Sequence, residues 1–178
     1  SEAEQEELLI RAWESWEKVC GIKLIRKRDT NANIIIDASA SRREEFGTAG
    51  NVLAWAYLPQ DSDWTGQLLM KFDLAETWIN DPRLRGILFL NVAAHEFGHL
   101  LGLEHTQIRG ELMYPTYDPR IWLPQPKYDI PQVILRYDEP IGGPVPPTPP
   151  DPGTPTEPAV GGVIKINGFE YELRRKAA

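Results

Sequence analysis

Apolar residues recur at three- and four-residue steps near the start of the chain, and this spacing predicts an amphipathic helix over residues 3–19. A longer, largely apolar stretch predicts a second helix over residues 85–101, and a third is predicted over residues 129–137. Pro131 falls in the first turn of the third helix, where a missing N–H costs nothing. The pattern therefore predicts about three helices.

Short segments rich in β-branched and aromatic residues lie between the first two helices, and this composition predicts strands. They are residues 22–25, 34–36, 51–58 and 67–72. Near the C-terminus, residues 163–166 and 169–173 alternate apolar and polar side chains around Asn167-Gly168. Such alternation around Asn-Gly predicts a β-hairpin.

Proline marks a change in organisation after the third helix. Nine of the sixteen prolines lie between residues 140 and 158, a density that excludes a helix or a central strand and predicts an extended linker. We therefore expect a globular domain over residues 1–139, a linker over residues 140–160 and the hairpin over residues 161–178.

Composition narrows the possible partners. The net charge of −7 and the pI near 5.0 argue against nucleic acid or an anionic membrane as a partner. No run approaches the roughly 20 apolar residues of a membrane span, and nothing demands more than a monomer. The chain begins at Ser1 without a visible signal peptide, so we expect a processed or trimmed form.

All three histidines of the chain lie in one segment, residues 95–105, which reads HEFGHLLGLEH. Residues four apart on a helix share a face, so His95 and His99 can present their rings to one metal ion. Gly102 lets the backbone leave the helix through a conformation that other residues tolerate poorly, which returns His105 as a third ligand. Three imidazoles and an open fourth position are typical of catalytic zinc.

Glu96 follows the first ligand, and its carboxylate would face a water at the open zinc position. It would take a proton from that water and later deliver it to the leaving amine of a cleaved peptide. A short H-E-x-x-H can occur by chance on a buried helix, but Gly102, His105 and the downstream Met113 make coincidence much less probable. Glu104 is a rival third ligand that is less well placed after the turn at Gly102.

The segment fits the metzincin zinc signature H-E-x-x-H-x-x-G-x-x-H, and residues 12–137 resemble the matrixins, the matrix metalloproteinase family. Thr106 is similar to the residue that follows the third histidine in matrixins. The LMYP sequence at residues 112–115 is similar to the matrixin Met-turn. Residues 50–54 resemble the edge strand that binds substrate in matrixins, and residues 72–78 resemble the segment that follows the next strand.

This resemblance implies a zinc-dependent, secreted endopeptidase acting on extended polypeptides. The fold would be α/β, with a twisted, mostly parallel sheet, an antiparallel edge strand and helices packed on it. Leu53 and Ala54 would bind the substrate main chain. Pro115, Tyr117 and the loop over residues 118–127 would shape the pocket for the side chain after the cleaved bond. Met113 would form an apolar floor beneath the histidines, a role compatible with plain core packing.

The chain also departs from the matrixin pattern. Trp55 and Lys71 stand where the family has histidine ligands of a second, structural zinc, so we expect none here. Asp73 and Glu76 match two calcium ligands of the family, although Gly47 stands where a third, an aspartate, is usual. A calcium site and an ordinary salt-bridged pair both remain open.

The strand that precedes the first helix in matrixins is missing, although it lies centrally in their sheet. An open slot in the centre of the sheet would leave the backbone N–H and C=O groups of the neighbouring strands unpaired. The C-terminal hairpin could fill this slot, with residues 169–174 as the replacement strand. The alternatives are an independent appendage, or a tail held in the cleft with Asp151 or Glu157 as its zinc ligand. A non-catalytic zinc-containing peptide-binding module is a further alternative, and Glu96 favours the enzyme over it.

Overall fold

The computed structural model describes residues 2–27, 34–37, 43–59, 68–140, 162–166 and 169–175. The expected proline-rich linker, residues 140–160, lies outside this part of the chain except for its first residue. Among the helices described, none is long and apolar enough to cross a membrane.

Two of the three predicted helices are found with nearly the expected bounds. The helices are α1 (Glu2–Glu17), α2 (Arg43–Phe46), α3 (Phe89–Leu100) and α4 (Asp129–Tyr137). The predicted start of α3 at residue 85 is wrong, because Ile87 donates its N–H to the Thr77 carbonyl at 2.8 Å and belongs to a short strand. Gly86, with a φ of 157°, also lies outside helical geometry. The single turn α2 was not predicted.

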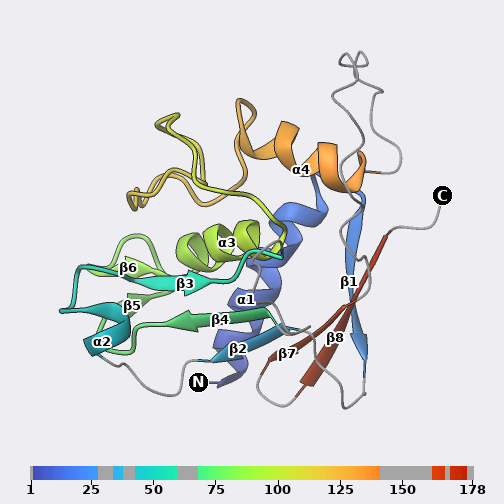
Figure 1. Ribbon diagram of the computed structural model, residues 1–178. Helices are drawn as coiled ribbons and strands as arrows, with labels where there is room; N and C mark the ends of the chain where they lie inside the picture. The colour runs from blue at the N-terminus through green and yellow to red at the C-terminus, as the bar shows by residue number, and fades with distance from the viewer. Residues whose placement is uncertain are drawn as a thin grey trace.

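The strands form one large and one small sheet. They are β1 (Ile22–Lys27), β2 (Ile34–Asp37), β3 (Ala54–Ala56), β4 (Leu68–Phe72), β5 (Trp78–Ile79), β6 (Ile87–Leu88), β7 (Gly162–Ile166) and β8 (Phe169–Arg175). The large sheet has the order β1-β8-β7-β2-β4-β3, and β5 pairs with β6 (Figure 1). The strand expected over residues 51–58 is shorter than predicted, since only its centre pairs with β4.

The large sheet is mixed in direction. β7 and β4 each run parallel to β2, and β8 runs antiparallel to both β1 and β7, so β1, β7, β2 and β4 share one direction. β3 runs antiparallel to β4 and forms the sheet edge nearest to α3 (Figure 1). β7 and β8 lie between β1 and β2, two strands that follow each other in the sequence.

Helix α1 fixes the position of α3 through buried aromatic residues. Trp16 donates its indole N–H to the carbonyl of Ala94 at 2.8 Å, and Trp13 packs edge-to-face on Phe97 with ring centroids 5.2 Å apart. Trp13, Trp16 and Phe97 have no exposed surface. A buried tryptophan whose N–H is satisfied contributes a large apolar area without a desolvation cost. These contacts hold the helix that carries the histidine motif.

Replacing Gly98 by alanine should destabilise this packing. A Cβ at residue 98 would overlap the sulfur of Met113 and lie 2.9 Å from the ring of Trp16, and both of those side chains are completely enclosed. Overpacking of this kind costs about 1–3 kcal/mol, which exceeds the gain in helix propensity of about 1 kcal/mol. Urea unfolding of Gly98→Ala should show a lower midpoint than the unchanged chain.

Glu14→Ala is the matched control, because Glu14 is an exposed position on α1. Its unfolding midpoint should change little. An equal or higher midpoint for Gly98→Ala would show that α3 and Met113 are not packed as described.

Candidate active site

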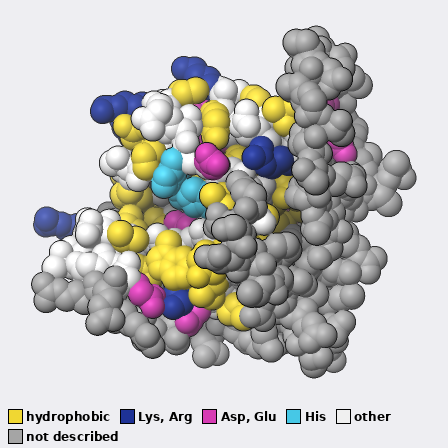
Figure 2. All heavy atoms as spheres, viewed as in Figure 1, with side chains coloured by type: hydrophobic (Ala, Val, Ile, Leu, Met, Phe, Trp, Pro, Cys, Tyr) yellow, Lys and Arg dark blue, Asp and Glu magenta, His cyan; other side chains and the backbone are white. Residues whose placement is uncertain are grey.

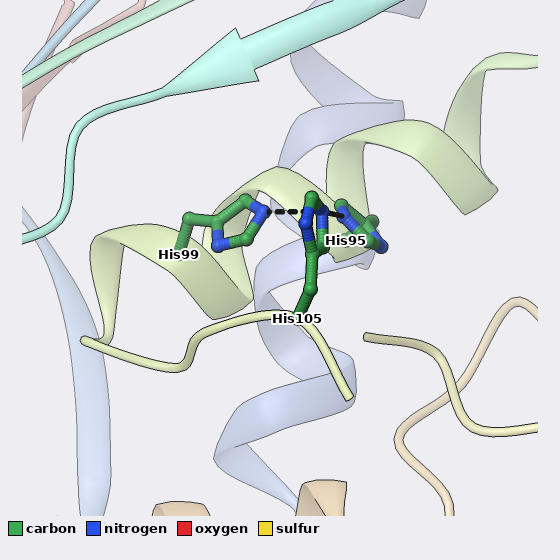
Figure 3. A group of neighbouring side chains, drawn as sticks. All are labelled: His95, His99 and His105. Atoms are coloured by element: carbon green, nitrogen blue, oxygen red, sulfur yellow. Dashed lines mark hydrogen bonds between the residues drawn. The ribbon is translucent and has the colours of Figure 1, made fainter. Parts of the chain in front are cut away.

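The three histidines of the motif converge on one point. The Nε2 atom of His105 lies 3.2 Å from Nε2 of His95 and 3.2 Å from Nε2 of His99 (Figure 3). His95 and His99 project from α3, and His105 reaches them from the segment that follows it (Figure 3). Among the residues that the structure describes, these three form the one group of potential metal ligands.

Hydrogen bonds on the far side of two rings fix their orientation. The Nδ1 atom of His95 lies 2.6 Å from the Leu112 carbonyl oxygen, and Nδ1 of His99 lies 2.7 Å from that of Leu103. A carbonyl oxygen can only accept, so each Nδ1 carries the proton and each Nε2 presents a lone pair. Metal-binding histidines are held in this way.

The protonation state of the rings also suits a metal. Burial, helped by the neighbouring His99 and His105, lowers the pKa of His95 to about 3. Burial also lowers the pKa of His105. At neutral pH both rings are therefore in the uncharged form that binds metal ions.

The donor set fits zinc. Zinc–nitrogen bonds of about 2.0–2.1 Å in a tetrahedral shell put neighbouring nitrogens about 3.3 Å apart, close to the observed 3.2 Å. Three imidazoles with room for one further ligand are the donor set of catalytic zinc. The rival Glu104 is exposed and does not belong to the cluster.

The turn at Gly102 brings His105 to the other two histidines. Gly102 has a φ of 85°, in the left-handed region that favours glycine. Its N–H donates to the His99 carbonyl at 2.8 Å, and the Leu103 N–H donates to the Gly98 carbonyl at 2.9 Å. This pair of bonds is a Schellman motif, which ends the helix and reverses the chain.

Asp129 holds the segment that orients His95, a role that was not predicted. Its buried carboxylate accepts hydrogen bonds from the backbone N–H groups of Leu112, Met113 and Gln125 at 2.6, 3.1 and 2.8 Å. The carbonyl of the same Leu112 accepts the hydrogen bond from Nδ1–H of His95. Burial raises the pKa of Asp129, whereas the three donors act in the opposite direction. In the sequence this aspartate suggested only the start of a helix.

Glu96 is a buried carboxylate beside the histidine cluster. It is 4% exposed, and burial raises its pKa to about 8. Its Oε2 is the single fully buried side-chain polar atom without a hydrogen-bond partner among the described residues. An orphaned buried oxygen is costly, and such groups concentrate at functional sites.

The histidines and Glu96 line a cleft of about 940 Å³. Figure 2 shows the histidine side chains at the surface, bordered by hydrophobic side chains. Leu53, Ala54, Pro115 and Tyr117, the residues predicted to bind substrate, all line the same cleft. Met113 lies fully buried, next to Gly98 of α3.

Backbone groups of β3 face the cleft at alternate residues. The Leu53 carbonyl accepts from Asp73 N–H at 2.9 Å, and the Tyr57 N–H donates to Leu69 at 3.0 Å. Because these groups point towards β4, those of Ala54 and Ala56 point towards the cleft. The Leu53 carbonyl is thus used within the sheet, and Ala56, which sequence reasoning did not single out, lines the cleft beside Ala54.

The two possible calcium ligands bind backbone amides. Asp73 is 1% exposed and accepts from Ala75 N–H at 2.8 Å, and Glu76 accepts from Gly50 N–H. Both carboxylates thus accept hydrogen bonds from the backbone, and Glu76 links the segment after β4 to Gly50.

Trp55 and Lys71, the two departures from the matrixin zinc-ligand pattern, lie opposite each other on β3 and β4. The Lys71 ammonium lies 3.1 Å from Glu45 and 5.4 Å from the centre of the Trp55 ring. The cation–π contact links β4 to Trp55 of β3, and the ion pair links β4 to α2.

The chain is similar to a known protein family and to several curated proteins. The family model for matrixin matches residues 1–133. The hatching enzyme of Paracentrotus lividus is 40% identical over 111 residues, covering 60% of this chain and 18% of that protein. Matrix metalloproteinase-18 of Xenopus laevis is 37% identical over 131 residues, covering 70% and 27%. Neutrophil collagenase of Homo sapiens is 35% identical over 170 residues, covering 90% and 34%. The chain spans about a third or less of the length of these curated relatives. Because the family model matches most of the chain, the chain belongs to the matrixin family.

Proposed function

We propose that this chain is a zinc-dependent endopeptidase domain that hydrolyses extended polypeptides. One observation carries the proposal. Three imidazole Nε2 atoms converge next to a buried carboxylate, Glu96, whose Oε2 has no partner among the described residues, and the whole group lines an open cleft. A site that only stored zinc would have no use for a buried carboxylate oxygen without a hydrogen-bond partner.

His95, His99 and His105 would hold the zinc ion. When bound, zinc supplies a Lewis acid that lowers the pKa of water and polarises a peptide carbonyl. Glu96 would accept the proton of the attacking water and pass it to the nitrogen of the departing amine. Glu96 lines the same cleft as the three histidines, so its carboxyl group lies on the wall where water and a peptide would bind.

The edge strand β3 would position the substrate. Ala54 and Ala56 direct backbone groups into the cleft, and an extended peptide could pair with them as an additional antiparallel strand. On the opposite wall, the Tyr117 hydroxyl accepts a hydrogen bond from Leu88 N–H at 2.9 Å. This bond would fix Tyr117 and Pro115 beside the pocket for the side chain that follows the cleaved bond.

We propose the remaining properties from the sequence and from the family. One zinc ion per chain is expected, because Trp55 and Lys71 offer no imidazole for a second. Polypeptide substrates and an extracellular location are proposed from the family, and a monomer is proposed because nothing in the sequence demands more. The net charge of −7 disfavours nucleic acid as a partner. The non-catalytic binding module and the tail-inhibited enzyme remain as outcomes of the tests below.

We also propose that the C-terminal hairpin is part of the catalytic domain. β7 pairs in parallel with β2 through residues 164 and 165, and β8 pairs with β1 over residues 170–175. Both strands, rather than residues 169–174 alone, would therefore fill the space between β1 and β2. Without them, the facing edges of two neighbouring strands would lack backbone partners.

Replacing Glu96 by alanine should abolish peptide hydrolysis while zinc stays bound. General base catalysis contributes about 10²–10⁴-fold, so the cleavage rate should fall by at least that factor. The measurement compares cleavage of a peptide library with zinc content, using mass spectrometry for both and a zinc chelator as the control for the unchanged enzyme. Undiminished cleavage would remove Glu96 from the mechanism. Absence of cleavage by the unchanged, zinc-loaded chain would favour the binding module or the tail-inhibited enzyme.

Deleting residues 159–178 should lower the stability of the whole domain. The unfolding transition in urea should move to lower concentration or lose its cooperativity, because two strands of the central sheet are removed. The matched control deletes residues 176–178 alone, which lie beyond β8. If the longer deletion unfolds like the unchanged chain, the hairpin is an independent appendage.

A further inference from the structure

Glu111 is a buried carboxylate that the sequence interpretation did not single out. It directly precedes Leu112 and Met113, and it is 5% exposed. Its Oε2 accepts hydrogen bonds from the backbone N–H groups of Tyr128 at 2.8 Å and Asp129 at 3.2 Å. These two partners lie 17 and 18 residues further along the chain, where α4 begins. A buried charged group requires such donors, so their identity indicates what Glu111 does.

Helix α4 receives its N-terminal cap from Glu111. Tyr128, the residue that precedes the helix, makes no capping hydrogen bond with its own side chain. The first backbone N–H groups of a helix have no partners within the helix and must find them elsewhere. Glu111 supplies the acceptor, and the negative charge of its carboxylate suits the positive end of the helix dipole. The position of α4 therefore depends on a residue outside it.

Glu111 and Asp129 bind each other's backbone segments in a reciprocal arrangement, called the Glu111–Asp129 clamp below. The Glu111 carboxylate accepts from the Asp129 N–H. In return, the Asp129 carboxylate accepts from the N–H groups of residues 112 and 113, which directly follow Glu111. The capping box of helices pairs side chains and backbone in the same reciprocal way, but over three residues only. Here neither segment can move away without breaking both sets of hydrogen bonds.

The clamp brings two acidic groups together in the protein interior. Asp129 has no exposed surface, and the charge of Glu111 adds to burial in raising the pKa of Asp129. Two neighbouring buried carboxylates are unfavourable unless hydrogen-bond donors compensate for them. Backbone N–H groups do so here, three at Asp129 and two at Glu111. A polar group that is costly to bury and fully compensated favours one rigid arrangement.

The segment that the clamp holds contacts the histidine motif at two places. The Leu112 carbonyl oxygen lies 2.6 Å from Nδ1 of His95. The Met113 carbonyl accepts a hydrogen bond at 3.0 Å from the N–H of Thr106, the residue that follows His105. A shift of residues 112 and 113 would therefore displace two of the three histidines that converge.

We propose that Glu111 is a positioning residue for the metal centre, an inference that rests on the peptidase function proposed above. By holding α4 against residues 111–113, Glu111 keeps the rings of His95 and His105 in the geometry that binds zinc. It acts through backbone groups rather than by contact with the metal ion. Loss of its acceptor oxygen should weaken zinc binding and slow turnover, while the binding of a peptide along β3 stays the same.

Two variants separate the acceptor oxygen from the charge. Glu111→Met keeps the length of the side chain and removes the acceptor, whereas Glu111→Gln keeps an acceptor oxygen and removes only the charge. The test measures zinc affinity in competition with a chromogenic chelator, and kcat and KM for a peptide that the unchanged enzyme cleaves. Glu111→Met should lose about tenfold in zinc affinity and about tenfold in kcat, with KM changed by less than about twofold. Glu111→Gln should stay within about twofold of the unchanged enzyme in all three quantities.

Leu9→Ala is the matched control for stability, because Leu9 is a buried residue on α1 that takes no part in the clamp. Truncation of a buried leucine should lower the midpoint of unfolding in urea. The folded variant should nevertheless keep the zinc affinity and the kcat of the unchanged enzyme. A loss of zinc affinity in Leu9→Ala as large as that in Glu111→Met would show that reduced stability alone explains the effect, and would overturn the positioning role.

Hydrogen exchange of the unchanged, zinc-loaded chain tests the clamp without any substitution, and so remains decisive if Glu111→Met does not fold. Because the clamp opens as one unit, the N–H groups of residues 128 and 129 should exchange as slowly as those of residues 112 and 113. Groups at the start of a helix that lack such a partner exchange much faster. Fast exchange at residues 128 and 129 alone would contradict the inference.

The remaining outcomes distinguish this inference from the peptidase function. If Glu111→Met keeps the zinc affinity and kcat of the unchanged enzyme, or if Glu111→Gln loses as much as Glu111→Met, the role of Glu111 is overturned and the peptidase function stands. Absence of chelator-sensitive cleavage by the unchanged, zinc-loaded chain would refute the peptidase function. The zinc affinities of the two variants would then still decide whether Glu111 positions the metal ligands.

Discussion

The convergence of three imidazole nitrogens is the constraint on which the rest of the site depends. Helical spacing aligns His95 with His99, but three separate contacts bring the nitrogens to one point. The turn at Gly102 returns His105, the Leu103 carbonyl orients His99, and the Leu112 carbonyl orients His95. Each contact uses a backbone group, so the shape of the chain itself determines which nitrogen of each ring faces the centre.

A longer chain of contacts supports this arrangement from outside the motif. Asp129, at the start of α4, binds the N–H of Leu112, whose carbonyl binds His95. Trp16, on α1, binds the carbonyl of Ala94, directly before His95 in the sequence. Buried, fully satisfied hydrogen bonds of this kind limit motion, and a metal site requires its ligands to be held within a fraction of an ångström. Helices α1 and α4, from the two ends of the domain, thus both help to determine the position of the His95 side chain.

Local signals in the sequence predicted the local parts of the structure. The helices over residues 3–19 and 129–137 and the turn at Gly102 follow from periodicity and from the properties of glycine, which act within a few residues. The start of α3 could not be predicted in this way, since a contact with Thr77 decides it. The hydrogen bonds that Asn91 donates to the carbonyl groups of Asp118 and Ile121 could not be predicted either, because these partners lie 27 and 30 residues away in the sequence.

The affinity of the chain for zinc tests most directly whether the three histidines converge as the ligands of one metal ion. The chain would be titrated with zinc in competition with a chromogenic chelator, alongside His105→Ala and Glu104→Gln. The account predicts one zinc ion per chain, a loss of affinity of more than about 100-fold for His105→Ala, and unchanged affinity for Glu104→Gln. Tight binding that survives the loss of His105, or that is lost with Glu104, would contradict the assignment of the three histidines as the metal ligands.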